Sequence, residues 1–315
     1  MSFGSQQIFD AISLTEAAAL ACYEWIGKGQ EKLADQAAVA AMRAQFERLD
    51  LAGKVVIGEG ERDEAPMLYI GEEVGKQDSI HKVDIAVDPL EGTTLCAHAA
   101  PNSISVLALA PRGSLLHAPD VYMEKIAVGK NLPKDLVDLD ASVEDNLKAL
   151  ANAKKCAVTD LKVCILNRPR HEALIAKVRA AGARVQLITD GDVTACIATV
   201  LEGCDIDIYL GVGGAPEGVL AAAALKSMGG FFQGRLQFKD DMQKNRAITL
   251  GITNPDAKLS ITDMVRDDVI FAASGVTSGW FLPGVKKNIG QTKVYSFATH
   301  FASSKQIFVN NIMSA

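Results

Sequence analysis

The sequence predicts an α/β protein built around a largely parallel sheet, and two observations support this fold class. Hydrophobic residues make up 49% of the 315 residues and charged residues 22%, which is typical of a chain that buries a large core. In the second half, short apolar segments alternate with segments of helical periodicity. Such alternation requires crossover connections, and these join parallel strands within one sheet. The length allows one large domain or two medium ones.

Two helices are expected first. An alanine-rich helix begins at Ser13 to Glu16, a segment that resembles a capping box, and ends near Gly27. A second helix runs from Asp35 to about Leu49, where apolar residues at helical spacing form one buried face. Asp35 stands in the first turn of this helix, where the helix dipole favours a carboxylate.

Short buried strands are expected next, at Lys54 to Ile57, Val83 to Val87 and Ser103 to Ala110. Residues 129–155, with an acidic helix that starts at Ser142, form the best candidate for an insertion or linker. We therefore expect an N-terminal metal-binding α/β region of residues 1–128 and a C-terminal α/β region of residues 156–315. These regions are two halves of one compact unit.

The remaining elements alternate along the second half. The expected strands are Val163 to Leu166, Arg184 to Ile188, Asp207 to Leu210 and Val269 to Ala273. The expected helices are His171 to Ala181, Asp192 to Leu201 and Pro216 to Met228. Lys293 to Phe301 and Gln306 to Ile312 are expected to form a hairpin of edge strands. Exposed edge strands are compatible with a homo-oligomer, either a dimer or a tetramer.

The charge and the cysteines exclude several classes of protein. Lys and Arg number 32 against 38 Asp and Glu, and the net charge of −6 argues against nucleic acid as a main partner. This net charge does not exclude small phosphorylated metabolites as ligands, because their binding needs only a few local cations. The six cysteines are scattered without a C-x-x-C pair, which predicts neither disulfides nor a thiolate zinc site and favours the reducing cytoplasm. No secretory signal and no membrane span is predicted.

The segment from Asp88 to Thr93 (Asp-Pro-Leu-Glu-Gly-Thr) is the most informative motif of the sequence. It follows a predicted strand and carries two carboxylates three positions apart. Its proline and glycine favour a tight turn that aims Asp88, Glu91 and the Thr93 hydroxyl at one point. Clustered oxygen ligands suit hard divalent cations, and Mg²⁺ sites commonly include a substrate phosphate. The motif therefore predicts metal-assisted phosphate chemistry. An acidic surface turn is the alternative interpretation of this motif alone.

Two further acidic motifs also follow predicted strands. In Gly58 to Glu61, the glycines on either side of Glu59 allow its carboxylate to turn inward, although a solvated acidic loop is the alternative. In Gly213 to Gly218, backbone amides at a helix start suit an anion, and Glu217 in the first turn suits a metal. A helix cap without other function is the alternative interpretation there.

The basic and mixed motifs complete the set. Arg168-Pro169-Arg170 presents two guanidiniums that can bind a phosphate in bidentate fashion, or it is a solvated loop. Asp190-Gly191-Asp192 can bind a sugar hydroxyl or can cap a helix. All of these motifs follow apolar strands, and ligands of open α/β sheets bind beyond the carboxyl ends of strands. The combination therefore predicts a site for metal ions and phosphate together.

Four segments resemble the class II fructose-1,6-bisphosphatases. They are Val56 to Glu61, Asp63 to Glu72, Asp84 to Thr93 and Gly213 to Gly218, and the likeness runs from about Thr15 to Ser304. The D-P-x-[DE]-G-T element is shared with inositol monophosphatases and other lithium-sensitive phosphatases. The resemblance implies a layered α-β-α-β-α sugar-phosphatase fold with mixed sheets. It implies hydrolysis of the 1-phosphate of fructose 1,6-bisphosphate in gluconeogenesis, with Mg²⁺ or Mn²⁺.

The resemblance also implies site residues. Metal ligands fall on Asp35, Glu59, Asp88, Glu91 and Glu217. Substrate contacts fall on Glu91, Gly92, Thr93, Tyr122, Arg168, Pro169, Arg170, Asp190, Gly191, Asp192 and Gly214. Catalytic roles fall on Thr93, Asp88 and Glu59, with Thr93 orienting a metal-activated water for in-line attack. Relatives can carry lysine where this chain has Glu31, next to Lys32, which puts a phosphate contact there in doubt.

Three alternatives share parts of this pattern. A sedoheptulose-1,7-bisphosphatase, or an enzyme with both activities, is the nearest in chemistry. An inositol-phosphate or nucleotide 3′-phosphatase shares the metal motif, but the segments Gly58 to Glu61 and Ala118 to Lys125 favour the bisphosphatase. A non-catalytic sugar-phosphate sensor is disfavoured by the intact Thr93 and the full set of acids.

Overall fold

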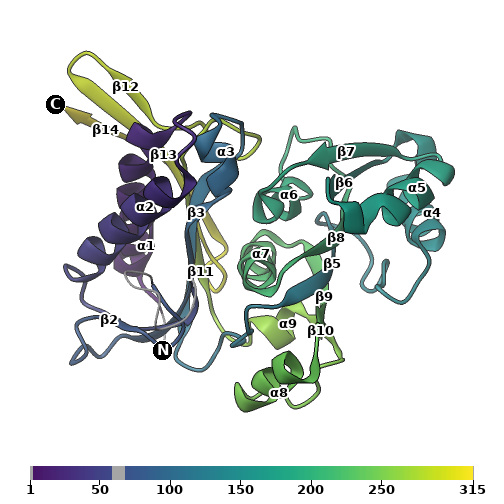
Figure 1. The fold of residues 1–315 in the computed structure, drawn as a ribbon, viewed down its shortest axis with the longest axis horizontal. Coiled ribbons are helices and arrows are strands. Elements are labelled where there is room, and N and C mark those ends of the chain that lie inside the picture. Colours follow the sequence, from purple (N-terminus) through teal and green to yellow (C-terminus); the bar gives the residue numbers. More distant parts are fainter. Residues whose placement is uncertain (1–2, 59–67, 315) are drawn as a thin grey trace.

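The computed structural model describes residues 3–58 and 68–314 as five layers in the order α-β-α-β-α (Figure 1). Helices α1 (Ser5–Cys22) and α2 (Glu31–Phe46) cover the outer face of the first sheet. Helices α6 (Asp192–Ala198) and α7 (Ala215–Met228) lie between the two sheets. Helices α4 (Val143–Lys154) and α5 (Glu172–Ala180) cover the second sheet. The layered fold expected from the resemblance is confirmed.

The first sheet has the order β12-β13-β11-β4-β3-β1-β2, with β14 paired to the other side of β13. Its strands are β1 (Ala52–Ile57), β2 (Glu73–Gly75), β3 (Lys82–Glu91), β4 (Ile104–Pro111), β11 (Ile270–Gly275), β12 (Lys286–Asn288), β13 (Gln291–His300) and β14 (Lys305–Ser314). The second sheet has the order β10-β9-β5-β8-β6-β7. Its strands are β5 (Tyr122–Val128), β6 (Lys162–Leu166), β7 (Arg184–Ile188), β8 (Ile208–Gly214), β9 (Phe231–Gln237) and β10 (Lys258–Ser260). The remaining α-helices of the described residues are α3 (Thr93–Ala97), α8 (Asp241–Thr249) and α9 (Ile261–Met264), and short 3₁₀ turns lie at Tyr23–Trp25, Val158–Asp160 and Pro169–His171.

The expectation of a largely parallel sheet is wrong for most of the molecule. Parallel pairs join β1 with β3 and β6 with both β7 and β8, and the other described pairs are antiparallel. Parallel neighbours occur in the second sheet where α5 and α6 provide crossover connections. The hairpin between β13 and β14 is antiparallel because its connection is short, whereas β4 with β11 and β5 with β8 are antiparallel neighbours from distant parts of the chain.

The N-terminal helices start earlier than the sequence predicts. Helix α1 begins after Gly4, and the hydroxyls of Ser13 and Thr15 donate to carbonyls of the preceding helical turn instead of capping a helix. Helix α2 begins at Glu31, so Asp35 stands in its second turn. The first-turn position predicted for Asp35 is therefore wrong.

Helix α7 forms the centre of the largest apolar cluster. Its run of alanines, Ala221–Ala224, is fully buried, and these small side chains let the helix fit between two sheets. Because α7 packs against a sheet on each side, its first turn lies at the ends of β3 and β8. Within the residues that the structure describes, no helix is both long and apolar enough to cross a membrane.

Candidate active site

The end of β3 carries two of the predicted ligands inside the strand and not in a turn beyond it. Strand β3 continues to Glu91, and its pairing with β4 shifts register between Asp88 and Glu91. Pro89 lies in this irregular stretch, and a proline cannot donate a ladder hydrogen bond. The Leu90 amide donates to Asp88 Oδ1 at 3.0 Å. The predicted tight turn is thus an irregular stretch of the strand, and it places both acids at the C-terminal end of this central strand.

Glu217 approaches the same point from the first turn of α7. An added Cβ at Gly214, the N-cap residue, would lie 2.1 Å from Glu217 Oε2, so only glycine leaves room for this carboxylate. Ligand atoms of Asp88, Glu91 and Glu217 all lie within 4.8 Å of one another. A cavity of about 100 Å³ adjoins Asp88 and Glu217, and Gly58 and Asp120 also line it.

The three carboxylates form a group whose negative charge needs compensation. Burial, with the carboxylates of Asp192 and Glu217, raises the pKa of Glu91 well above its ordinary value. Burial also raises the pKa of Glu217. Glu217 Oε2 is buried and accepts no hydrogen bond within the described part of the chain. A buried, orphaned oxygen beside two more carboxylates fits a hard divalent cation.

A buried lysine lies next to this acidic group. Lys125 Nζ is 2.6 Å from Asp192 Oδ2, and both side chains are almost fully buried, at 1% and 6% exposure. Tyr209 donates its hydroxyl to the same oxygen at 3.3 Å. An added Cβ at Gly213 would lie 2.1 Å from Asp192 Oδ2, so this glycine lets the ion pair approach β8. Asp192, predicted to contact substrate, therefore directs its carboxylate into the protein.

Thr93 is the first residue of α3, directly after Gly92. Gly92 has a φ of +78°, a left-handed conformation that glycine adopts without steric cost. This sharp change of direction separates the strand that holds Glu91 from the short helix that holds Thr93. Thr93 itself is partly buried, and the Glu91 carboxylate accepts from the Val193 amide at 3.2 Å.

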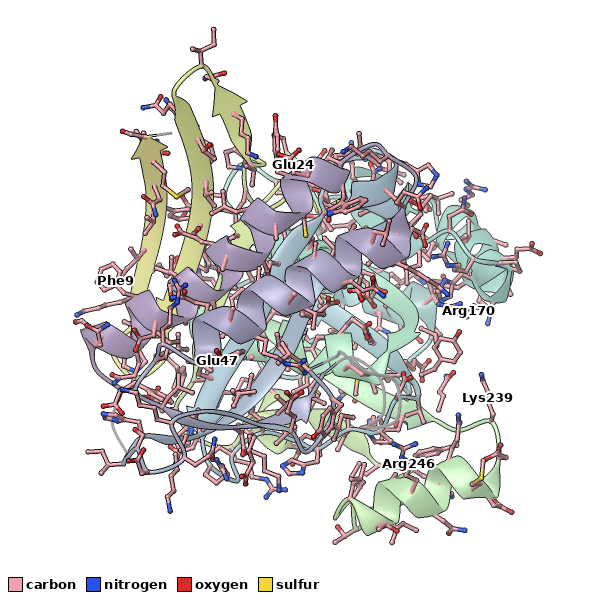
Figure 2. All side chains as sticks on the ribbon, turned by 60° about the vertical axis from the view of Figure 1, so that its left-hand side comes forward. Phe9, Glu24, Glu47, Arg170, Lys239 and Arg246 are labelled. Carbon is pink, nitrogen blue, oxygen red and sulfur yellow. The ribbon has the colours of Figure 1, made fainter. Side chains whose placement is uncertain are left out.

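The predicted basic pair lies beside an aromatic ring. Arg170 donates to the Val212 carbonyl from Nε and one terminal nitrogen, and its guanidinium lies 4.8 Å from the centre of the Tyr122 ring. Lys239 lies 5.7 Å from the centre of the same ring. Figure 2 shows Arg170 and Lys239 on the same side of the molecule. The Tyr122 ring therefore makes cation–π contacts with two positively charged side chains at an exposed surface.

The remaining predicted residues surround these groups. Arg168 is partly buried, and Pro169 starts a short 3₁₀ turn that leads into α5. Gly191 is the N-cap of α6, with a φ of +84°. Burial raises the pKa of Asp190, with a further rise from Asp192 and Glu31 and an opposing effect from Arg168.

Asp35 and Glu59 are not part of the described group of three carboxylates. Burial raises the pKa of Asp35. Burial raises the pKa of the Cys22 thiol well above its ordinary value, with smaller contributions from the negative charges of Cys96, Asp35 and Asp88. Glu59 lies outside the described residues.

Sequence reasoning assigned no role to Lys125, Lys239 or Asp120. A signal for Lys125 was present, because strand periodicity places it on the same face as Met123 and Ala127, both fully buried. A charged residue at such a position must have a buried partner. No signal of this kind marked Lys239, because its place beside Tyr122 results from the pairing of β5 with β9.

Comparison with known proteins is consistent with this geometry. Residues 5–313 match the family described as bacterial fructose-1,6-bisphosphatase, glpX-encoded. A protein of Synechocystis named D-fructose 1,6-bisphosphatase class 2/sedoheptulose 1,7-bisphosphatase is 41% identical, over 96% of this chain and 94% of its own. A protein of Thermosynechococcus vestitus with the same name is 42% identical over the same shares.

Solved structures give more distant matches. The extragenic suppressor protein SuhB of Bartonella henselae has a TM-score of 0.36 and 14% identity, over 62% of this chain and 74% of its own. An inositol monophosphatase of Anabaena has a TM-score of 0.33 and 14% identity, over 62% and 70%. The family match and the curated relatives span almost the whole chain. The chain therefore belongs to the bacterial, glpX-encoded fructose-1,6-bisphosphatase family and is a phosphatase.

Proposed function

We propose that the protein hydrolyses the 1-phosphate of fructose 1,6-bisphosphate to fructose 6-phosphate and phosphate, in gluconeogenesis, with Mg²⁺ or Mn²⁺. The observation that carries this proposal is the convergence of Asp88, Glu91 and Glu217 within 4.8 Å beside a cavity. These three residues would hold the cation, together with Asp35 and Glu59 as the resemblance implies. A bound divalent cation offsets phosphate charge and lowers the pKa of a coordinated water.

The residues of the chain position the reactants. Thr93 orients the attacking water through its hydroxyl, from the rigid corner at Gly92. Phosphoryl transfer depends mainly on position and charge compensation, so no covalent nucleophile is needed. The amide of Gly214 adds a donor for phosphate, and Arg168 neutralises phosphate oxygens. Asp190 and the Gly191 amide contact sugar hydroxyls.

The phosphate that remains on the sugar binds at Tyr122. The Arg170 guanidinium lies 4.8 Å and the Lys239 ammonium 5.7 Å from the centre of the Tyr122 ring, and two cations near one ring suit a phosphate dianion. Arg170 is already oriented by the Val212 carbonyl, so little side-chain freedom is lost on binding.

Sedoheptulose 1,7-bisphosphate is a second candidate substrate, because the curated relatives carry both activities in their names. Both substrates place two phosphates at the ends of a sugar. A phosphate-release assay with the two bisphosphates and inositol monophosphate, each with Mg²⁺ and with Mn²⁺, separates these functions. Release from neither bisphosphate would contradict the proposal and would favour a sensor.

The Thr93→Ala variant tests the mechanism. We expect kcat to fall by about 100-fold or more with a small change in KM, because a misplaced water reacts slowly. Thr94→Ala, one position later on α3, is the matched control and keeps kcat within about twofold. A near-normal kcat in Thr93→Ala would remove Thr93 from the mechanism.

We also propose a cytoplasmic location and a homo-oligomeric state, either a dimer or a tetramer. All six cysteines are free thiols, four of them buried, which suits a reducing compartment. The exposed C-terminal strands β12 and β14 support the oligomer.

A further inference from the structure

The outer edge of β14 is an open binding surface. All ten residues of β14 pair with β13 in one continuous antiparallel register, from Gln291 with Ser314 to His300 with Lys305. Within the described part of the chain, no strand pairs with its other edge. Strands β12, β13 and β14 project from the upper left of Figure 1, and in Figure 2 these yellow strands form the left border of the molecule.

This edge lacks the features that keep edge strands apart. Native proteins protect long edge strands with prolines, bulges or charged side chains. Strand β14 contains no proline, its register has no shift, and its single charged residue, Lys305, stands at one end. A regular, almost uncharged edge of ten residues is therefore suited to pair with another strand.

Both faces of β14 carry apolar side chains. On one face, Phe308 is 65% exposed and Ile312 is 48% exposed, although the Phe308 ring contacts Phe297 at 4.8 Å between centroids. On the other face, Ile307, Val309 and Met313 are partly buried against the cluster that includes α1. Figure 2 shows Phe9 of α1, 53% exposed, projecting outward near this border.

We propose that β14 pairs with β14 of a second copy of this chain, antiparallel, about a two-fold axis at Asn310. In this register Phe308 lies opposite Ile312 of the partner subunit, and Ile307 lies opposite Met313 of the partner subunit. Asn310 lies opposite Asn310 of the partner subunit, and the two amide side chains can hydrogen-bond to each other. The first sheets of the two copies then form one continuous sheet.

The pattern of side chains favours a second copy over a foreign strand. An isologous contact requires a surface that complements itself. The register centred on Asn310 pairs one apolar residue with another on each face, and only Val309 lies opposite a polar residue, Asn311 of the partner subunit. A register centred on Val309 would place Phe308 opposite Asn310 and Ile307 opposite Asn311. In the register centred on Asn310, the two Lys305 side chains are separated by about ten residues, roughly 34 Å, so they do not repel.

Sedimentation analysis of the full chain tests the interface. At micromolar concentration we expect twice the chain mass of 33.5 kDa, or an even multiple of it. Phe308→Lys combined with Ile312→Lys should halve that mass, and Ile312→Lys alone should weaken association at least tenfold. Met242→Lys, at a 76% exposed position on α8, is the control and should change nothing. A monomeric wild type, or a lysine variant of unchanged mass, would overturn the proposal.

A cysteine pair tests the register, and does not depend on the lysine variants folding. Asn310→Cys places a thiol next to its own copy on the axis, so mild oxidation should give a covalent dimer on a non-reducing gel. Gln306→Cys is the control, because Gln306 lies on the same face of the same strand. In the proposed register it lies opposite Ser314 of the partner subunit, eight residues from Gln306 of the partner subunit, so its thiols should not crosslink. Equal crosslinking of the two variants would contradict the register, and so would no crosslinking in either.

Discussion

At the scale of single residues, Lys125 is among the largest fully buried side chains of the protein and is charged. Its pairing with Asp192 at 2.6 Å compensates the cost of burial. We expect Lys125→Met to lower the free energy of unfolding by about 3 kcal/mol or more, because it leaves Asp192 buried and unpaired. Adding Asp192→Asn should restore part of the loss, and urea denaturation of the four proteins measures this coupling.

The surface pair Lys130–Glu202 is the matched control for that measurement. Its nitrogen and oxygen lie 3.2 Å apart, but the side chains are 43% and 90% exposed. We expect Lys130→Met to cost less than about 1 kcal/mol, because water already solvates both charges. Additive losses for Lys125→Met and Asp192→Asn would show that the buried pair is not coupled.

Glu217 gives a pH-dependent prediction. Burial raises its pKa above the ordinary value, so its ionised form is disfavoured in the folded state, and metal-free stability falls as pH rises through the folded-state pKa. Glu217→Gln stays neutral at every pH. We therefore expect the metal-free variant to melt about 2 °C above the metal-free wild type at pH 8, with a smaller difference at pH 5. Calorimetry without divalent ions measures both values, and a difference that grows on acidification would contradict the assignment.

At the scale of elements, Gly92 connects the strand that carries Glu91 to the helix that carries Thr93. A Cβ at Gly92 would lie 2.9 Å from Leu95 Cδ1, at a φ of +78°. Gly113 has a similar φ of +86°, with no atom within 4 Å of an added Cβ. Alanine at either position should cost about 1 kcal/mol of stability.

Only Gly92→Ala should also lower kcat, by about 10-fold to 100-fold, because it redirects the start of the helix that holds Thr93. Urea denaturation of the two alanine variants measures the cost of backbone strain to stability, and steady-state kinetics measures the effect on kcat. Equal kcat values in both variants would show that the corner at Gly92 is not needed to position Thr93.

Some elements could be predicted from sequence, and others could not, for physical reasons. Strand β7 and most of α7 follow directly from apolar patterns with clear ends. The starts of α1 and α2 were missed because neither N-cap, Gly4 nor Gln30, bonds the helix through a side-chain oxygen. The antiparallel pairing was also missed, because a local pattern does not determine which strands become neighbours.

The same limit applies to the site. Asp88, Glu91 and Glu217 could be proposed because each stands next to glycine or proline at the end of an apolar run. The inward direction of Asp192 could not, since it depends on Lys125 from a strand 67 positions earlier. Lys239 likewise reaches Tyr122 only through the pairing of β5 with β9.

At the scale of the whole molecule, the chain crosses between its sheets twice. Strands β1 to β4 and β11 to β14 build the first sheet, and strands β5 to β10 build the second. The division into regions 1–128, 129–155 and 156–315 stays a proposal about folding units. The acidic group draws Asp88 and Glu91 from the first sheet and Glu217 from α7, which packs between both.

Because a cation at this group would connect the first sheet to α7, it should stabilise the whole molecule. At a free Mn²⁺ concentration 100 times the dissociation constant, binding to the folded state alone contributes about 2.7 kcal/mol. We expect Tm to rise by about 5 °C over the chelator-treated protein, measured by scanning calorimetry. Glu217→Gln should lose most of this rise, while Glu202→Gln, at an exposed position, should keep it. An equal rise in all three proteins would show that the ion binds elsewhere, because only the first variant changes the acidic group.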